Sequence, residues 1–77
     1  MKIEILGPGC LKCTKLYENV KEALKTIGMD AEVIKIEDIN KITEYGIMMT
    51  PGLVVDGKVK AVGKLLSTEE IKTIILG

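Results

Sequence analysis

Apolar and polar residues alternate along this 77-residue chain with two different periods. A period of two residues indicates strands, and a spacing of three and four residues indicates amphipathic helices. The period of two occurs over residues 2–6 and 31–36, and the short segments 52–55 and 58–62 on either side of Asp56-Gly57 are also predicted to be strands. The helical spacing occurs from residue 10 to residue 27, over residues 39–45 and from residue 67. The pattern therefore predicts the element order βαβαββα.

Capping and turn residues support these boundaries. Asp56-Gly57 is the dipeptide typical of a two-residue hairpin between the last two strands. Ser67 and Glu70 have the spacing of a capping box, which predicts the start of the last helix. Gly28 and Gly46 follow the first two helices, as helix-ending residues do.

The connections predict how the strands pair. A helical crossover between the first two strands requires them to be parallel, whereas the hairpin strands are antiparallel. We expect an α/β fold with a mixed four-stranded sheet and helices on its faces. No linker or repeat divides the sequence, so we expect residues 1–77 to form one domain.

Composition excludes several functions. Eleven lysines balance eleven acidic residues, and there is no Arg and no His. A neutral chain gives no reason to expect nucleic acid or a membrane surface as partner. Without His, no Cys–His or Ser–His catalytic pair can form. No apolar run approaches the ~20 residues of a membrane span, and no signal peptide is recognisable, so we expect a cytoplasmic protein.

Both cysteines lie in one motif, Cys10-Leu11-Lys12-Cys13, between the first strand and the first helix. This spacing allows the sulfurs to form a disulfide or to bind one metal ion. A helix N-terminus and Lys12 both favour the thiolate, so the Cys10 pKa is expected below the ~8.5 of a free thiol. The exposed end of the turn makes Cys10 the candidate nucleophile, and Cys13 then resolves the mixed disulfide.

Metal binding is the alternative from another functional class. Two thiolates suit Cu(I), and two molecules could share one zinc ion. However, small metallochaperones with this motif have the order βαββαβ and a Met two residues before the first cysteine. This chain has Pro8 there and is predicted to end in a helix.

The sequence resembles the minimal thioredoxin/glutaredoxin fold, in the small "redox-active disulfide" family, over nearly its whole length. The features that carry the resemblance are Cys10 and Cys13, Thr50-Pro51, the hairpin 54–59 and the turn with Val62-Gly63 before the last helix. The resemblance implies a thiol–disulfide oxidoreductase that needs no bound cofactor and acts as a monomer. Its implied partners are protein disulfides and a separate thioredoxin-reductase-like flavoprotein that restores the dithiol.

The resemblance also implies roles for residues outside the cysteine motif. Thr50-Pro51 is expected to be cis and to face the cysteines, with Thr50, Pro51 and Gly63 binding the substrate backbone. Glu4 stands six residues before Cys10, where thioredoxins have a buried acid, and is a candidate modulator of the Cys10 pKa together with Lys12. The pattern alone favours a solvent-facing Glu4.

Overall fold

The computed structural model describes residues 1–9 and 11–77. Within that part of the chain, the elements follow the predicted order. They are β1 (Lys2–Leu6), α1 (Leu11–Ile27), β2 (Glu32–Ile36), α2 (Ile39–Glu44), β3 (Gly52–Val55), β4 (Lys58–Val62) and α3 (Thr68–Leu76). The predicted strand and helix boundaries agree with these to within one residue.

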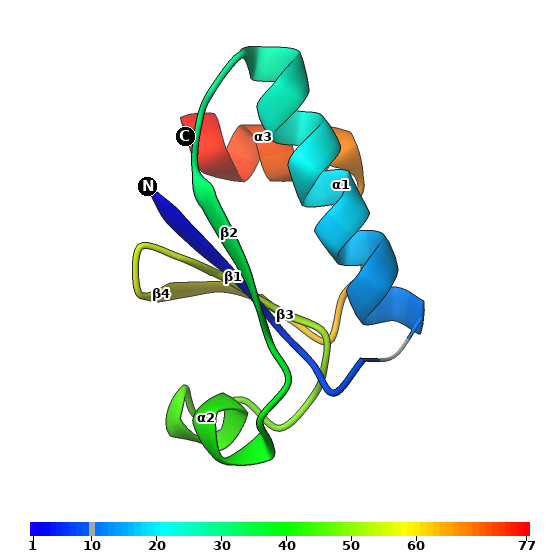
Figure 1. Cartoon of the computed structure of the whole chain (residues 1–77), viewed down its shortest axis with the longest axis vertical. Coiled ribbons are helices and arrows are strands. Elements are labelled where there is room, and N and C mark those ends of the chain that lie inside the picture. The colour runs from blue at the N-terminus through cyan, green and yellow to red at the C-terminus, as the bar shows by residue number, and fades with distance from the viewer. Residues whose placement is uncertain (10) are drawn as a thin grey trace.

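The strands form a sheet in the order β2-β1-β3-β4 (Figure 1). β1 pairs with β2 in parallel, with Ile3 opposite Val33. β3 runs antiparallel to β1 and to β4. The predicted mixed sheet, with the hairpin beside the first strand, is therefore confirmed.

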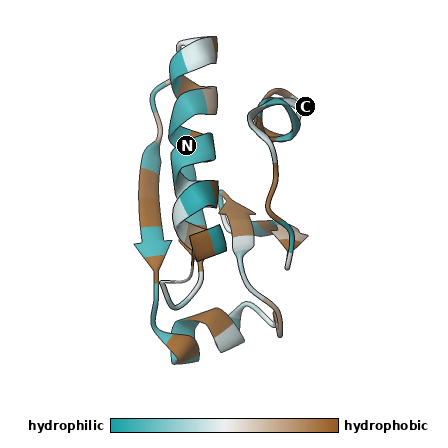
Figure 2. Cartoon of the chain, turned by 90° about the vertical axis from the view of Figure 1, so that its right-hand side faces the viewer, coloured by the Kyte–Doolittle hydropathy of each residue, from teal (hydrophilic) through white to brown (hydrophobic). Residues whose placement is uncertain are grey.

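Alternation along β1 separates two apolar clusters, one on each face of the sheet. Ile3 and Ile5 pack with residues of α1 and α3, whereas Leu6 packs with Ile42 and Ile47 around α2. Figure 1 shows α1 and α3 together and α2 apart from them. Hydrophobic colour in Figure 2 marks much of the strands, while most of α1 beyond its first turn is hydrophilic on the side in view. The sheet is thus covered on both faces.

The predicted turn and cap are both present. Asp56 and Gly57 have φ angles of 49° and 82°, as a type I′ hairpin turn requires at its two central positions. Ser67 is the N-cap of α3: its Oγ accepts from the Glu70 N–H at 3.2 Å, and Glu70 accepts from the Ser67 N–H at 3.0 Å. No helix in the described part of the chain has the length and hydropathy to cross a membrane.

Candidate functional site

Cys13 is buried in the first turn of α1, where that helix packs against the residue that follows β1. Its side chain is 1% exposed. A Cβ atom placed on Gly7 would overlap the Cys13 Sγ and lie 3.1 Å from the Cys13 Cβ. The sulfur of Cys13 is therefore packed directly against the backbone of Gly7. Cys10, the predicted nucleophile, lies outside the described residues, and its predicted pKa stays a prediction.

Thr50 and Pro51 lie next to this contact. The Cβ of Thr50 is 3.8 Å from the same Cβ position at Gly7, so Thr50 and Cys13 flank Gly7 from two elements far apart in sequence. The Thr50–Pro51 peptide bond is cis, as the resemblance implied. Pro51 is fully buried, and its position directly before β3 places it at the same end of the sheet as Cys13.

Gly63 is held beside Pro51 by the pairing of β3 with β4. Gly52 is opposite Val62 in that pairing, and the Gly63 N–H donates to the Pro51 carbonyl at 2.8 Å. A Cβ atom on Gly63 would lie 3.0 Å from the Met49 Cβ and 3.1 Å from its Cε. The Met49 side chain therefore lies beside Gly63 while staying 63% exposed. No motif in the sequence marks Met49 as a neighbour of Gly63.

Exposed apolar side chains surround this end of the molecule. Leu11 is 90% exposed and Met48 is 98% exposed, and Leu65, in the loop before α3, is 40% exposed. Lys12, between Leu11 and Cys13, is also exposed. Leu11 and Leu65 line one hollow, and Met48 lines another together with Thr50. Exposed apolar side chains around hollows are typical of binding surfaces, so this end is the candidate functional surface.

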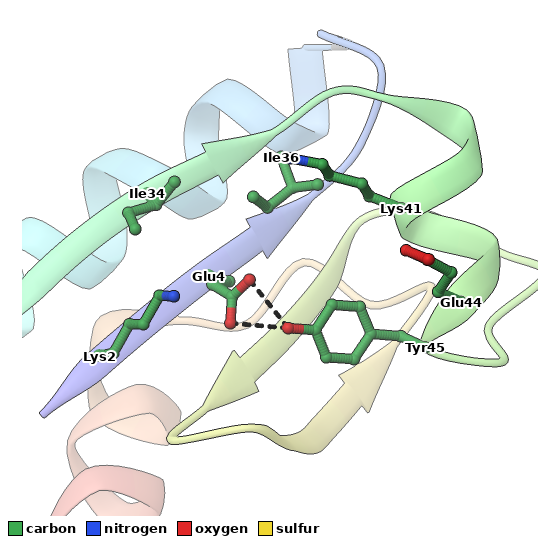
Figure 3. Close-up of a pocket in the computed structure, with 7 residues that line it drawn as sticks. All are labelled: Lys2, Glu4, Ile34, Ile36, Lys41, Glu44 and Tyr45. Carbon is green, nitrogen blue, oxygen red and sulfur yellow. Dashed lines mark hydrogen bonds between the residues drawn. The ribbon is translucent and has the colours of Figure 1, made fainter.

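Glu4 is buried, and its interpretation as a solvent-facing residue is wrong. It is 6% exposed, and the Tyr45 hydroxyl donates to its two carboxylate oxygens at 2.8 and 2.9 Å (Figure 3). Burial of a carboxylate is tolerated because this hydrogen bond replaces water. Alternation along β1 puts Glu4 on the face covered by α2, whereas Cys13 belongs to the helix on the opposite face. The predicted effect of Glu4 on the Cys10 pKa stays a prediction.

Known proteins similar to this chain show its family. A model of the thioredoxin domain matches residues 1–76. A thioredoxin from Methanothermobacter thermautotrophicus is 48% identical over 75 residues, which cover 97% of each chain. A thioredoxin from Methanocaldococcus jannaschii is 47% identical over 91% of this chain and 80% of its own, and a probable thioredoxin from Methanothermobacter marburgensis is 37% identical over 82% and 79%. The chain belongs to the thioredoxin family.

Family membership gives the general class of activity, which is thiol–disulfide oxidoreduction. It does not favour the metallochaperone alternative. In residues 1–9 and 11–77, no three His, Cys, Asp or Glu side chains are grouped to hold a metal ion. The residues that the structure brings together at one end of this thioredoxin-family sheet are Gly7, Cys13, Met49, Thr50, Pro51 and Gly63.

Tyr45, 41 residues from Glu4 in the sequence, supplies the hydroxyl that binds the Glu4 carboxylate. The hydrogen bond to Glu4 raises the Tyr45 pKa above its ordinary value, and burial and the charges of Glu4 and Glu44 act in the same direction. The pair lies in a hollow of about 470 Å³ that Lys2 and Lys41 also line (Figure 3). Tyr45 thus ties the end of α2, just before the loop that carries Thr50, to β1.

Proposed function

We propose that Cys10 and Cys13 are the redox pair of this protein and exchange with disulfides in other proteins. The observation that supports this most is the position of Cys13: buried in the first turn of α1, against Gly7 and next to Thr50. A buried second cysteine beside a more N-terminal one suits the resolving role, because it is shielded from other disulfides until the first cysteine has reacted.

The reaction proceeds in two balanced exchanges. The Cys10 thiolate attacks one sulfur of a partner disulfide and forms a mixed disulfide, and the released partner thiolate takes up a proton. Cys13 then loses its proton and attacks the Cys10 sulfur. The second partner thiol leaves, and the Cys10–Cys13 disulfide remains. The partner gains two electrons and two protons, and the thiols themselves carry the electrons, so no bound cofactor is needed.

Neighbouring residues have supporting roles in this proposal. Lys12 favours the Cys10 thiolate through its charge. The backbone at Thr50 and Pro51 pairs with an extended segment of the substrate, and Gly63 keeps the adjacent backbone free of a Cβ atom. Met49 lies over Gly63 in the free protein, so its flexible side chain must adjust when a substrate binds.

The proposal also includes the cellular setting. We propose that the protein works in the cytoplasm, where a reducing environment keeps cysteine pairs in the dithiol form. There it acts as a monomer on protein disulfides. A separate thioredoxin-reductase-like flavoprotein restores the dithiol by the reverse sequence of exchanges.

Two variants test the mechanism. Cys10→Ser should abolish reduction of a protein disulfide, because no thiolate is left to attack. Cys13→Ser should accumulate mixed disulfides through Cys10, detected by intact mass and lost on addition of a small thiol. Wild-type protein that turns over no disulfide and instead binds one equivalent of Cu(I) or zinc tightly would overturn the proposal in favour of the metal alternative.

A further inference from the structure

A groove runs along one side of the candidate surface, between the first turns of α1 and the loop before α3. It measures about 420 Å³ and is lined by Leu11, Lys12, Thr14, Lys15, Glu18 and Leu65. Leu11 directly follows Cys10 in the sequence. The groove therefore begins at the cysteine motif and leads away from it along α1.

The two sides of this groove are held together by a specific contact. The Asn19 side-chain amide of α1 donates to the Leu66 carbonyl at 2.9 Å. Leu66 is buried in the core cluster shared by α1 and α3, and Ser67 caps α3 directly after it. These contacts fix the loop, so Leu65 is held opposite α1 before any partner binds. Preorganisation of this kind reduces the entropy lost on binding.

The groove combines an apolar centre with a positive rim. Leu11 and Leu65 are 90% and 40% exposed, and Figure 2 shows hydrophobic colour at the start of α1 below a mostly hydrophilic helix. Lys12 and Lys15 are both exposed and three residues apart, so they lie on the same side of α1. With Glu18 as the acidic residue of the lining, the groove carries one net positive charge.

We propose that this groove binds the substrate segment beside its reactive cysteine, and that it selects an apolar side chain accompanied by an acidic residue. This inference rests on the proposed disulfide exchange and adds the chemistry of the preferred substrate. The apolar side chain covers Leu11 and Leu65, and the acidic residue faces Lys15 and Lys12. Charge complementarity of this kind favours encounter with the right partners and disfavours basic segments.

The test compares disulfide peptides that differ only beside their cysteine. One carries Leu and Asp there, a second Leu and Lys, and a third Ser and Asp, each joined to the same neutral small thiol. The Leu-Asp peptide should have a kcat/KM about threefold to tenfold above that of the Leu-Lys peptide at low salt. That gap should narrow in about 0.5 M NaCl, because salt screens exposed charges. The Leu-Asp peptide should also exceed the Ser-Asp peptide by about tenfold.

Variants locate the preference in the groove. Lys15→Glu should remove or invert the ratio between the Asp and Lys peptides, and Leu65→Ser should reduce the ratio between the Leu and Ser peptides. Lys25→Glu, in the last turn of the same helix, makes the same charge change away from the groove and should leave both ratios unchanged. Ratios within one variant cancel any effect of the substitution on the thiol chemistry itself.

The possible failures are distinguishable. Equal rates for all three peptides, with normal turnover of a neutral small disulfide, would overturn this inference and leave the proposed function intact. An acidic preference that survives Lys15→Glu would overturn it as well. A dimer in sedimentation that Leu65→Ser dissociates would show that a second copy covers the groove, which also contradicts it. No exchange with any disulfide would instead overturn the proposed function.

Discussion

The sulfur of Cys13 occupies the space in which a side chain at Gly7 would begin. Gly7 is buried at the end of β1, and its φ is not in the positive range that favours glycine. Glycine is therefore needed here because a Cβ atom would overlap the Cys13 sulfur, and not because of the backbone conformation. Position 7 sets how closely the first turn of α1, with its buried cysteine, approaches the sheet.

Gly7→Ala should therefore impair the resolving cysteine more than it impairs the fold. The new methyl group must displace the Cys13 side chain, at a cost of about 1–3 kcal/mol in the free energy of unfolding. With its sulfur displaced, Cys13 should attack the mixed disulfide at Cys10 more slowly, so the partner thiol should be released more slowly. Stopped-flow release of a labelled partner thiol measures the rate, and denaturant unfolding measures the stability.

Ile5→Val is the matched control for that experiment. Ile5 is 1% exposed in β1, two residues before Gly7, and its truncation costs about 0.5–1.5 kcal/mol while position 7 keeps its glycine. It should release mixed disulfides at the wild-type rate. If Gly7→Ala did so too, the contact between Gly7 and Cys13 would have no part in resolution.

Tyr45→Phe should destabilise the protein although it removes a single oxygen atom. Glu4 would keep its charge and its burial but lose the hydroxyl that now binds both carboxylate oxygens. Leaving a buried acceptor without its donor costs about 1–3 kcal/mol. Denaturant unfolding at neutral pH measures the loss.

Tyr17→Phe provides the control, because the Tyr17 ring lies 5.4 Å and 5.2 Å from the ammonium groups of Lys21 and Lys35. Phe keeps the ring, so the change in stability should stay within about 0.5 kcal/mol. A double-mutant cycle with Glu4→Leu, which has no acceptor for the phenol proton, isolates the Glu4–Tyr45 interaction. Additive effects of Glu4→Leu and Tyr45→Phe would contradict it.

The fold could be predicted from the sequence because its signals are local. The alternation in residues 2–6, the Asp56-Gly57 turn and the Ser67–Glu70 capping box each depend on residues within a few positions of one another, and each is present in the structure. The cis bond before Pro51 was implied by the family resemblance and not by a local pattern.

The contacts that could not be predicted from the sequence join residues that are far apart in it or lie in an irregular loop. Tyr45 and Glu4 are 41 residues apart, and an acidic residue in an alternating strand has the pattern of a solvent-facing one. Glu4 is buried because α2 and Tyr45 cover its face of the sheet, and the alternation of residues in β1 does not show which helix covers which face. The approach of Met49 to Gly63 likewise follows from the path of the 46–51 loop, which no periodicity encodes.

The phenol of Tyr45 should titrate above its ordinary pKa of 10.0. Ionising it would break the hydrogen bond to Glu4 and bring two negative charges together. Tyr17→Phe leaves Tyr45 as the single tyrosine of the chain, so phenolate absorbance then reports it alone. Glu4→Leu in that background should lower the midpoint, because it removes the hydrogen bond that is the largest cause of the shift, together with the charge of Glu4. A midpoint at or below 10.0 with Glu4 present would contradict the assignment.

The same shift fixes the direction of a stability change in alkali. Because the folded-state pKa of Tyr45 is raised, the neutral phenol stabilises the fold below the ordinary pKa, and that stabilisation is lost as pH rises through the raised value. Wild type should therefore lose more stability than Tyr45→Phe over this range. Parallel curves for the two proteins would show that the hydrogen bond is absent in solution.

Glu70 should make the start of α3 sensitive to acid. Its carboxylate pairs with the Lys64 ammonium at 2.9 Å and accepts from the Ser67 backbone N–H, and these contacts lower its pKa from 4.5 to about 2. A carboxyl with a lowered folded-state pKa stabilises the fold above its unfolded value, and this contribution disappears as pH falls from about 4.5 towards 2. Wild type should therefore lose more stability than Glu70→Gln over that range, since Gln has no charge to lose.

Two further variants separate the causes of that acid sensitivity. Lys64→Gln should raise the Glu70 pKa towards 4.5 and move the loss of stability to higher pH, because the ion pair is the largest cause of the shift. Ser67→Ala should cost about 1 kcal/mol at neutral pH through loss of the cap. It should leave the ion pair in place, because Lys64 and Glu70 both remain. The free energy of unfolding measured against pH for wild type and the three variants checks this. If Lys64→Gln lost stability over the same acidic range as wild type, the exposed ion pair would not be the cause of the lowered Glu70 pKa.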